Sequence, residues 1–207
     1  MHAVCRVPTD VMFVLDSSGS IGEESYQRMR EYTFNYTEGL LNGNSDSRVG
    51  VILYSRSARV EIDLDFLNNN TQEELLQETR QLPYPGGSTN TPEGLCLLKS
   101  RPWRESVSVL RIAIVLTDGM SNQLSTNCTS ESGGSGTVNS TAREIHSFEP
   151  PITVFAVGVA NFAEEELNVI ATSPDLVDRL DSFDQSLLLQ NQQFHSYFIC
   201  FRGTYIM

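Results

Sequence analysis

The sequence predicts an α/β domain built on a mostly parallel six-stranded sheet, with one antiparallel edge strand and helices on both faces. Strand-like and helix-like segments alternate along the chain, as in parallel sheets. Several strand candidates are continuous apolar runs, as expected for strands buried on both faces. The 207 residues, 40% hydrophobic and 19% charged, suit one globular domain.

The first half of the chain supplies three of the expected strands. Residues 11–15 form an apolar run that ends at Asp16. The next two strand candidates are residues 49–54 and 59–64. Because only a short connection separates them from each other, we expect them to pair as an antiparallel hairpin at the sheet edge. A helix is expected over residues 23–41, and its candidates for burial are Tyr26, Met29, Phe34 and Leu41.

The second half continues the alternation. Residues 121–140, rich in Ser, Gly, Thr and Asn, are expected to form a long exposed loop. The other expected elements are helices over 72–82, 92–100, 141–148, 164–171 and 184–199, and strands over 109–116, 152–159 and 176–180. This arrangement is a Rossmann-like, doubly wound fold.

Charge and hydropathy exclude two classes of partner. The net charge is −12 and Lys99 is the sole lysine, whereas proteins that bind nucleic acid without regard to sequence need a Lys/Arg surface. Apolar runs stay far below the roughly 20 residues that span a bilayer. We therefore expect no nucleic-acid partner and no membrane insertion of this segment.

The four cysteines permit two disulfides, and the connectivity is open among three possibilities. Cys5 and Cys200 lie near opposite ends of the chain, and their pairing would leave Cys96 with Cys128. CxxC spacing is absent, so a zinc site built on these cysteines is not expected. The alternative is four free thiols in an intracellular protein.

Four N-x-[ST] sequons, at Asn35, Asn69, Asn127 and Asn139, are glycosylation candidates and favour a secreted protein. The first residues lack the apolar core of a signal peptide. We therefore expect a module of a longer, multidomain extracellular protein. Its folded domain is expected over residues 10–199, between short flanks at 1–9 and 200–207.

Oxygen-bearing side chains gather where ligands bind in open α/β sheets, beyond the carboxyl ends of the strands. Asp16, Ser18 and Ser20 follow the first strand, Thr89 lies in the loop before residues 109–116, and Asp118 follows that strand. Such hard donors favour Mg²⁺, Ca²⁺ or Mn²⁺ over zinc or copper. Because the hydroxyl ligands are neutral, a bound ion would keep an open position for a partner's carboxylate.

Three segments together resemble the metal-ion-dependent adhesion site of von Willebrand factor A domains. They are VLDSSGSIG at 14–22, GGSTNT at 86–91 and LTDG at 116–119, and the resemblance covers about residues 10–197. The resemblance implies that Ser18 and Ser20 ligate the ion directly and Thr89 directly or through water. It further implies that Asp16 and Asp118 contact the ion or hold its waters. The expected cation is Mg²⁺, with Mn²⁺ or Ca²⁺ as alternatives.

The sequence is most similar to the A domains of matrilins, collagens and other matrix or cell-surface proteins. That branch implies an extracellular adhesion module whose partner is collagen or another matrix or cell-surface glycoprotein. Tyr84 and Asn122 are candidates for the rim of the site, by loop position. In integrin-type relatives the last helix slides, so residues 184–199 could move here, restrained by a Cys5–Cys200 bridge.

Other interpretations of the same residues remain open. Ser20 could be an ordinary helix N-cap, or the domain could bind partners or self-assemble without metal. A Mg²⁺-dependent phosphatase needs a carboxylate where Ser18 stands, and P-loop and GxGxxG motifs are absent. The histidines, His2, His146 and His195, form no recognisable triad. We therefore do not expect an enzyme, and an intracellular scaffold remains a further alternative.

Overall fold

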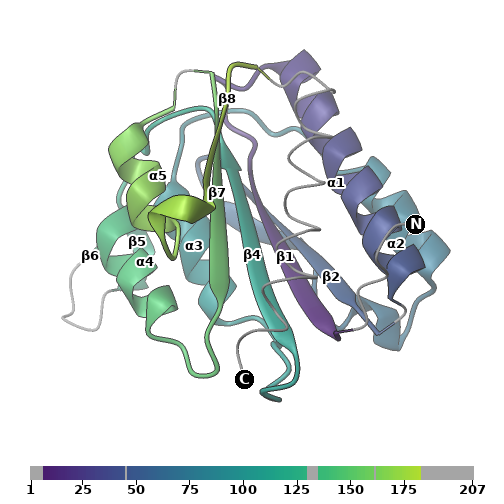
Figure 1. Cartoon of the computed structure of the whole chain (residues 1–207). Helices are drawn as coiled ribbons and strands as arrows, with labels where there is room; N and C mark the ends of the chain where they lie inside the picture. The colour runs from purple at the N-terminus through teal and green to yellow at the C-terminus, as the bar shows by residue number, and fades with distance from the viewer. Residues whose placement is uncertain (1–6, 45, 130–134, 161, 183–207) are drawn as a thin grey trace.

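A computed structural model describes residues 7–44, 46–129, 135–160 and 162–182 of the chain. Its main sheet has the strand order β3-β2-β1-β4-β7-β8 (Figure 1). The only antiparallel pair in this sheet joins β2 and β3, at the edge. These strands are β1 (Thr9–Asp16), β2 (Arg48–Tyr54), β3 (Ala58–Ile62), β4 (Leu110–Thr117), β7 (Thr153–Val159) and β8 (Val177–Leu180). The predicted fold class is confirmed.

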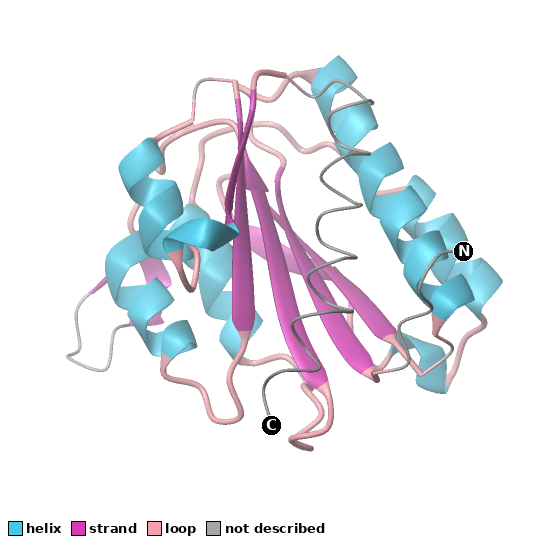
Figure 2. Ribbon diagram, viewed as in Figure 1, coloured by secondary structure: helices cyan, strands magenta, loops and turns pink. Residues whose placement is uncertain are grey.

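Helices cover both faces of this sheet. Figure 2, in the same view, shows α1 and α2 on one face and α3, α4 and α5 on the other. Their bounds are α1 (Glu23–Gly43), α2 (Gln72–Arg80), α3 (Thr91–Lys99), α4 (Val138–His146) and α5 (Glu164–Ile170). Two short 3₁₀ helices, η1 (Phe66–Asn68) and η2 (Pro174–Leu176), also belong to the described part of this layered fold.

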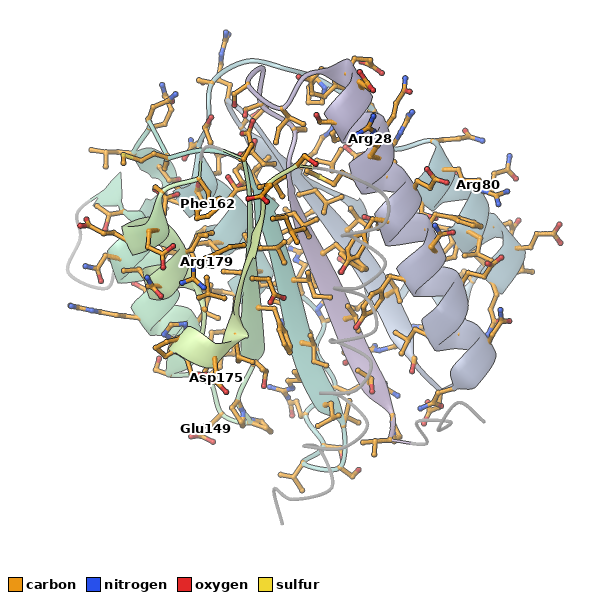
Figure 3. All side chains as sticks on the ribbon, turned by 45° about the horizontal axis from the view of Figure 1, so that its top comes forward. Arg28, Arg80, Glu149, Phe162, Asp175 and Arg179 are labelled. Atoms are coloured by element: carbon orange, nitrogen blue, oxygen red, sulfur yellow. The ribbon has the colours of Figure 1, made fainter. Side chains whose placement is uncertain are left out.

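The core is centred on β1, every residue of which is buried. Phe13 of β1 meets Tyr36 of α1 edge to face, with ring centroids 5.3 Å apart. Figure 3 shows side chains filling the space between the helices and the sheet. All four residues predicted to face inward from this helix are buried, namely Tyr26, Met29, Phe34 and Leu41. The apolar periodicity thus located the main packing of α1.

The prediction of a long exposed loop over residues 121–140 was wrong, because the segment contains regular structure. Within it, β5 (Ser125–Thr129) and β6 (Ser135–Gly136) form a small antiparallel sheet. The helix α4 also begins earlier than expected, at Val138, because Thr137 and Ser140 form reciprocal capping hydrogen bonds. The Ser, Thr and Gly composition concealed both features, since it is as typical of loops as of caps.

Several predictions concern residues outside the described part of the chain. They are the helix at 184–199 and the proposed pairing of Cys5 with Cys200. Within the described part, we find no helix that is both long and apolar enough to cross a membrane.

Candidate metal centre

The candidate site lies at the carboxyl ends of two neighbouring parallel strands. Asp16 is the last residue of β1, and Asp118 directly follows β4. The two strands run side by side in register, with Leu15 opposite Leu116. Residues that follow them therefore emerge at the same edge of the sheet, as expected for ligand sites in open α/β sheets.

A chain of hydrogen bonds joins four of the five candidate ligands. The hydroxyls of Ser18 and Ser20 lie 3.0 Å apart, and the Ser20 hydroxyl donates to Oδ1 of Asp118 at 3.0 Å. Oδ1 of Asp16 accepts from the backbone N–H of Ser18 at 2.9 Å. Residues 98 positions apart in sequence thus face one another at one point.

Thr89, the fifth candidate, is held beside these residues by its main chain. Its N–H donates to Oδ1 of Asn122 at 3.2 Å, and its carbonyl accepts from the N–H of Asn122 at 3.0 Å. In the same loop, the carbonyl of Gly87 accepts from the N–H of Gly19 at 2.8 Å. Gly87 has φ 104°, a conformation that glycine adopts without strain. The Thr89 hydroxyl makes no hydrogen bond to the other four candidates.

The N-cap interpretation of Ser20 is wrong. The N-cap residue of α1 is Gly22, whose φ is 73°, and no side chain caps the helix. Ser20 is exposed and directs its hydroxyl to Asp118 instead. The serine spacing in this loop therefore serves the contact between β1 and β4 rather than the start of the helix.

The two carboxylates are close, buried to different degrees and without a cationic partner. Asp16 is fully buried, and burial raises its pKa to about 6 against the opposing effect of hydrogen bonds from Ser18 and Thr117. The nearby charge of Asp118 raises it further. Burial also raises the pKa of Asp118. Among the described residues neither carboxylate forms an ion pair with Lys or Arg, so a divalent cation would stabilise both.

The donor set is consistent with a hard divalent cation. It consists of carboxylate and hydroxyl oxygens, the ligands that Mg²⁺, Ca²⁺ and Mn²⁺ prefer. The part of the chain that the structure describes contains no cluster of three or more His, Cys, Asp or Glu side chains placed to hold a metal. A cation here would thus depend on the hydroxyls as well as the two carboxylates.

Sequence reasoning missed the supporting roles of three side chains, although it named one of them, Tyr84, as a rim candidate. Thr117 donates from Oγ1 to Oδ2 of Asp16 at 2.8 Å. Glu166 of α5 accepts from the N–H of Ser121, its two carboxylate oxygens lying 2.9 and 3.2 Å from the nitrogen. The hydroxyl of Tyr84, expected at the rim, bonds to the main chain of Ser18 and Gly22 in the loop after β1. Thr117 and Tyr84 each had a sequence signal, namely the position of Thr117 just before Asp118 and the loop position of Tyr84, whereas Glu166 had none.

One cysteine prediction can be followed in part. Cys96 of α3 is disulfide-bonded. Its predicted partner, Cys128, belongs to β5, which packs against α3, but its side chain lies outside the described part of the structure. The pairing of these two cysteines is therefore still a proposal.

Comparisons with known proteins give consistent results. The family model for the von Willebrand factor type A domain matches residues 10–193. The chain is 32% identical over 177 residues to the collagen alpha-1(XXI) chain of Xenopus laevis, covering 84% of this chain and 17% of the collagen. It is 29% identical over 190 residues to matrilin-1 of Gallus gallus, covering 87% of this chain and 35% of the matrilin. It therefore spans about a sixth to a third of the length of these matrix proteins.

A solved structure supports the fold. Proximal thread matrix protein 1 from the mussel byssus superposes with a TM-score of 0.74 at 21% identity. That structure is described as having zinc in its MIDAS motif, the metal-ion-dependent adhesion site. The match covers 94% of this chain and 47% of the mussel protein. At this identity the likeness establishes the common architecture and nothing beyond it.

Proposed function

This chain belongs to the von Willebrand factor type A family, and we propose that it is an extracellular adhesion module that binds its partner through a divalent cation. The observation that carries the proposal is the convergence of Asp16, Ser18, Ser20 and Asp118 at one edge of the sheet. Two carboxylates placed together without a Lys or Arg partner in the described part of the chain favour a cation over a structural role.

Each group has a distinct part in this proposal. Asp16 and Asp118 supply the negative charge, and Ser18, Ser20 and Thr89 supply neutral oxygens. When bound, the cation would attract an acidic side chain of the partner, because its hydroxyl ligands are neutral and would leave it an open coordination position for an outside carboxylate. Burial of Asp16 excludes water from one side of the site and leaves the exposed Ser20 side for the partner.

We expect Mg²⁺ as the cation because all proposed ligands are oxygens, with Mn²⁺ and Ca²⁺ as alternatives. Zn²⁺ belongs in the same test, since the mussel protein is described with zinc at its MIDAS motif. The collagen and matrilin relatives favour an extracellular matrix location within a longer, multidomain protein. They also favour collagen or another matrix or cell-surface glycoprotein as the partner, and the proposal gives no residue a catalytic role.

Calorimetric titration of the metal-free domain with Mg²⁺, Mn²⁺, Ca²⁺ and Zn²⁺ tests the site. The wild type should bind one ion per chain, and Asp118→Asn should abolish that signal because it removes a charge while keeping the side-chain shape. Asp65→Asn is the matched control, since Asp65 is exposed and distant in the fold, beside η1. Absence of binding in the wild type, or full binding in Asp118→Asn, would contradict the proposal and favour a metal-independent interaction module.

A further inference from the structure

We propose that Tyr84 is a positioning residue of the metal loop, whose hydroxyl holds residues 18–22 in the shape that binds the cation. The inference rests on the proposed function, because it takes Ser18 and Ser20 as metal ligands. It differs from a rim role, since the hydroxyl bonds to the loop itself and not to a partner.

The Tyr84 hydroxyl bridges two main-chain groups of the loop. It donates to the carbonyl of Ser18 at 2.8 Å and accepts from the N–H of Gly22 at 3.0 Å. One oxygen atom therefore closes the segment that carries both serine ligands. The Ser20 side chain lies between the two bonded positions, and Ser18 is itself one of them, so the bridge sets where both hydroxyls point.

The tyrosine ring is fixed in place by α1. Its centroid lies 4.8 Å from that of the fully buried Tyr26, with 30° between the ring planes. Arg30 of the same helix donates to the carbonyl of Leu82 at 3.1 Å, which ties the segment before Tyr84 to α1. Because the ring is anchored by the helix, the hydroxyl is presented to the loop independently of any cation.

This arrangement matters for affinity because hydroxyl ligands are neutral and bind a cation only when they are already oriented. Groups that orient the ligands of a metal site, without touching the metal, change metal affinity by about 10–100-fold when they are removed. The Tyr84 bridge is such a group for Ser18 and Ser20. Thr117 has the corresponding position beside Asp16, on the other side of the site.

Tyr84→Phe tests the inference, since it removes the bridging oxygen and keeps the ring that packs on Tyr26. Tyr26→Phe is the matched control, because it removes the same atom from the adjacent ring, and the Tyr26 hydroxyl has no hydrogen-bond partner among the described residues. Calorimetry with Mg²⁺ and Mn²⁺ gives the dissociation constants, and thermal melting in EDTA gives the stability of the metal-free fold.

We expect Tyr84→Phe to weaken Mg²⁺ and Mn²⁺ binding by about 10–100-fold, while Tyr26→Phe leaves it unchanged. A purely structural role predicts the opposite pattern, a lower melting temperature in EDTA with an unaltered dissociation constant, and that result would overturn the inference. A wild type that binds no ion would instead remove the proposed function itself, so the two failures are distinguishable.

Amide hydrogen exchange on the metal-free wild type provides a second test that needs no variant. The Gly22 N–H should be protected, because its acceptor is the Tyr84 hydroxyl and is present before a cation binds. Fast exchange of this amide in folded, metal-free protein would show that the bridge is not preformed, and the inference would then be wrong.

Discussion

Strand β1 carries an aspartate near each end, and the two differ in how their charge is neutralised. Asp10 is fully buried and accepts hydrogen bonds from the side chains of both Arg48 and Arg104 at 2.8 Å. Asp16, equally buried, is bonded to a backbone N–H and a hydroxyl, and has no ion pair in the described part of the chain. The charge of Asp10 is thus neutralised by arginines of the chain itself, whereas the charge of Asp16 would be neutralised by a bound cation.

Stability in acid should depend on Asp10. Burial raises the pKa of this carboxyl, but the hydrogen bonds from Arg48 and Arg104 outweigh burial and hold the pKa below its ordinary value of 3.8. A lowered pKa in the folded state means that the ionised form stabilises the fold above pH 3.8 and that this stabilisation is lost as pH falls through the folded pKa.

Asp10→Asn should therefore destabilise the domain at neutral pH by about 3–5 kcal/mol, because two partly buried arginines lose their carboxylate. The variant should also lose less of its remaining stability between neutral pH and strong acid than the wild type does. Urea unfolding at a series of pH values measures both effects. Equal loss on acidification in the two proteins would show that Asp10 is not the group responsible.

The five candidate ligands could be named from sequence because four belong to short motifs at strand ends and Thr89 to a motif in a loop, and the structure joins the four by hydrogen bonds. Their supporting residues could not, because the contacts depend on segments that are distant in the chain. Glu166 is one of three consecutive glutamates, and nothing in that run distinguishes it from its neighbours. Its carboxylate meets Ser121 only after α5 packs against β7. Tyr84 was placed in the correct neighbourhood, but its loop position did not indicate which groups the hydroxyl would meet.

At the scale of elements, α5 restrains the loop that follows β4. Glu166 accepts from the N–H of Ser121, and the Ser121 hydroxyl donates to the carbonyl of Thr89 at 3.3 Å. A short helix thus connects two of the three loops that form the site. A shift of α5 would therefore displace the loops that carry Asp118 and Thr89, because these hydrogen bonds link them to the helix.

Glu166→Ala should release this connection, whereas Glu165→Ala, which truncates the exposed neighbouring carboxylate, should not. Because a hydrogen bond to a half-buried carboxylate is lost, the free energy of unfolding should fall by about 1–2 kcal/mol in Glu166→Ala. Hydrogen exchange should show faster exchange at the Ser121 amide in Glu166→Ala alone. Identical exchange in both variants would mean that α5 does not hold the loop.

Elements were predictable to the extent that they bury apolar side chains. The central strands are nearly continuous apolar runs, and their predicted ends are within two residues of those observed. The strand β5 has the sequence STNCT and no such run. It pairs with β6 and packs against α3, so its conformation depends on tertiary contacts that a local pattern does not contain.

At the scale of the whole molecule, the direction of the chain in the sheet separates one sequon from the candidate metal site. The strand β3 runs antiparallel to β2, so the segment after β3 emerges at the end of the sheet opposite to Asp16 and Asp118. Asn69 lies in that segment, beside η1, and its side chain is exposed. A glycan on Asn69 would therefore not obstruct the end of the sheet that carries Asp16 and Asp118.

The sequons should therefore differ in occupancy. Asn69 should be glycosylated when the domain is secreted from mammalian cells. Asn35 should not, because it lies in the middle of α1 and its sequon hydroxyl, on the fully buried Thr37, donates to the carbonyl of Thr33. Mass spectrometry after glycosidase treatment, with Asn69→Gln and Asn35→Gln compared, measures this. A glycosidase-sensitive mass that is smaller in Asn35→Gln than in the wild type, but unchanged in Asn69→Gln, would contradict the assignment.

The two aspartates of β1 stand six residues apart along one rigid strand, a separation of roughly 20 Å at about 3.3 Å per residue. At that distance, substitutions without shared partners contribute additively to the free energy. The domain therefore separates two properties that many metal proteins combine. The Asp10 end, paired with arginines, would set the stability of the scaffold, while the Asp16 end would set the proposed affinity for cations. Substitutions around Asp10 should therefore change stability without changing cation affinity, and substitutions around Asp16 should do the reverse.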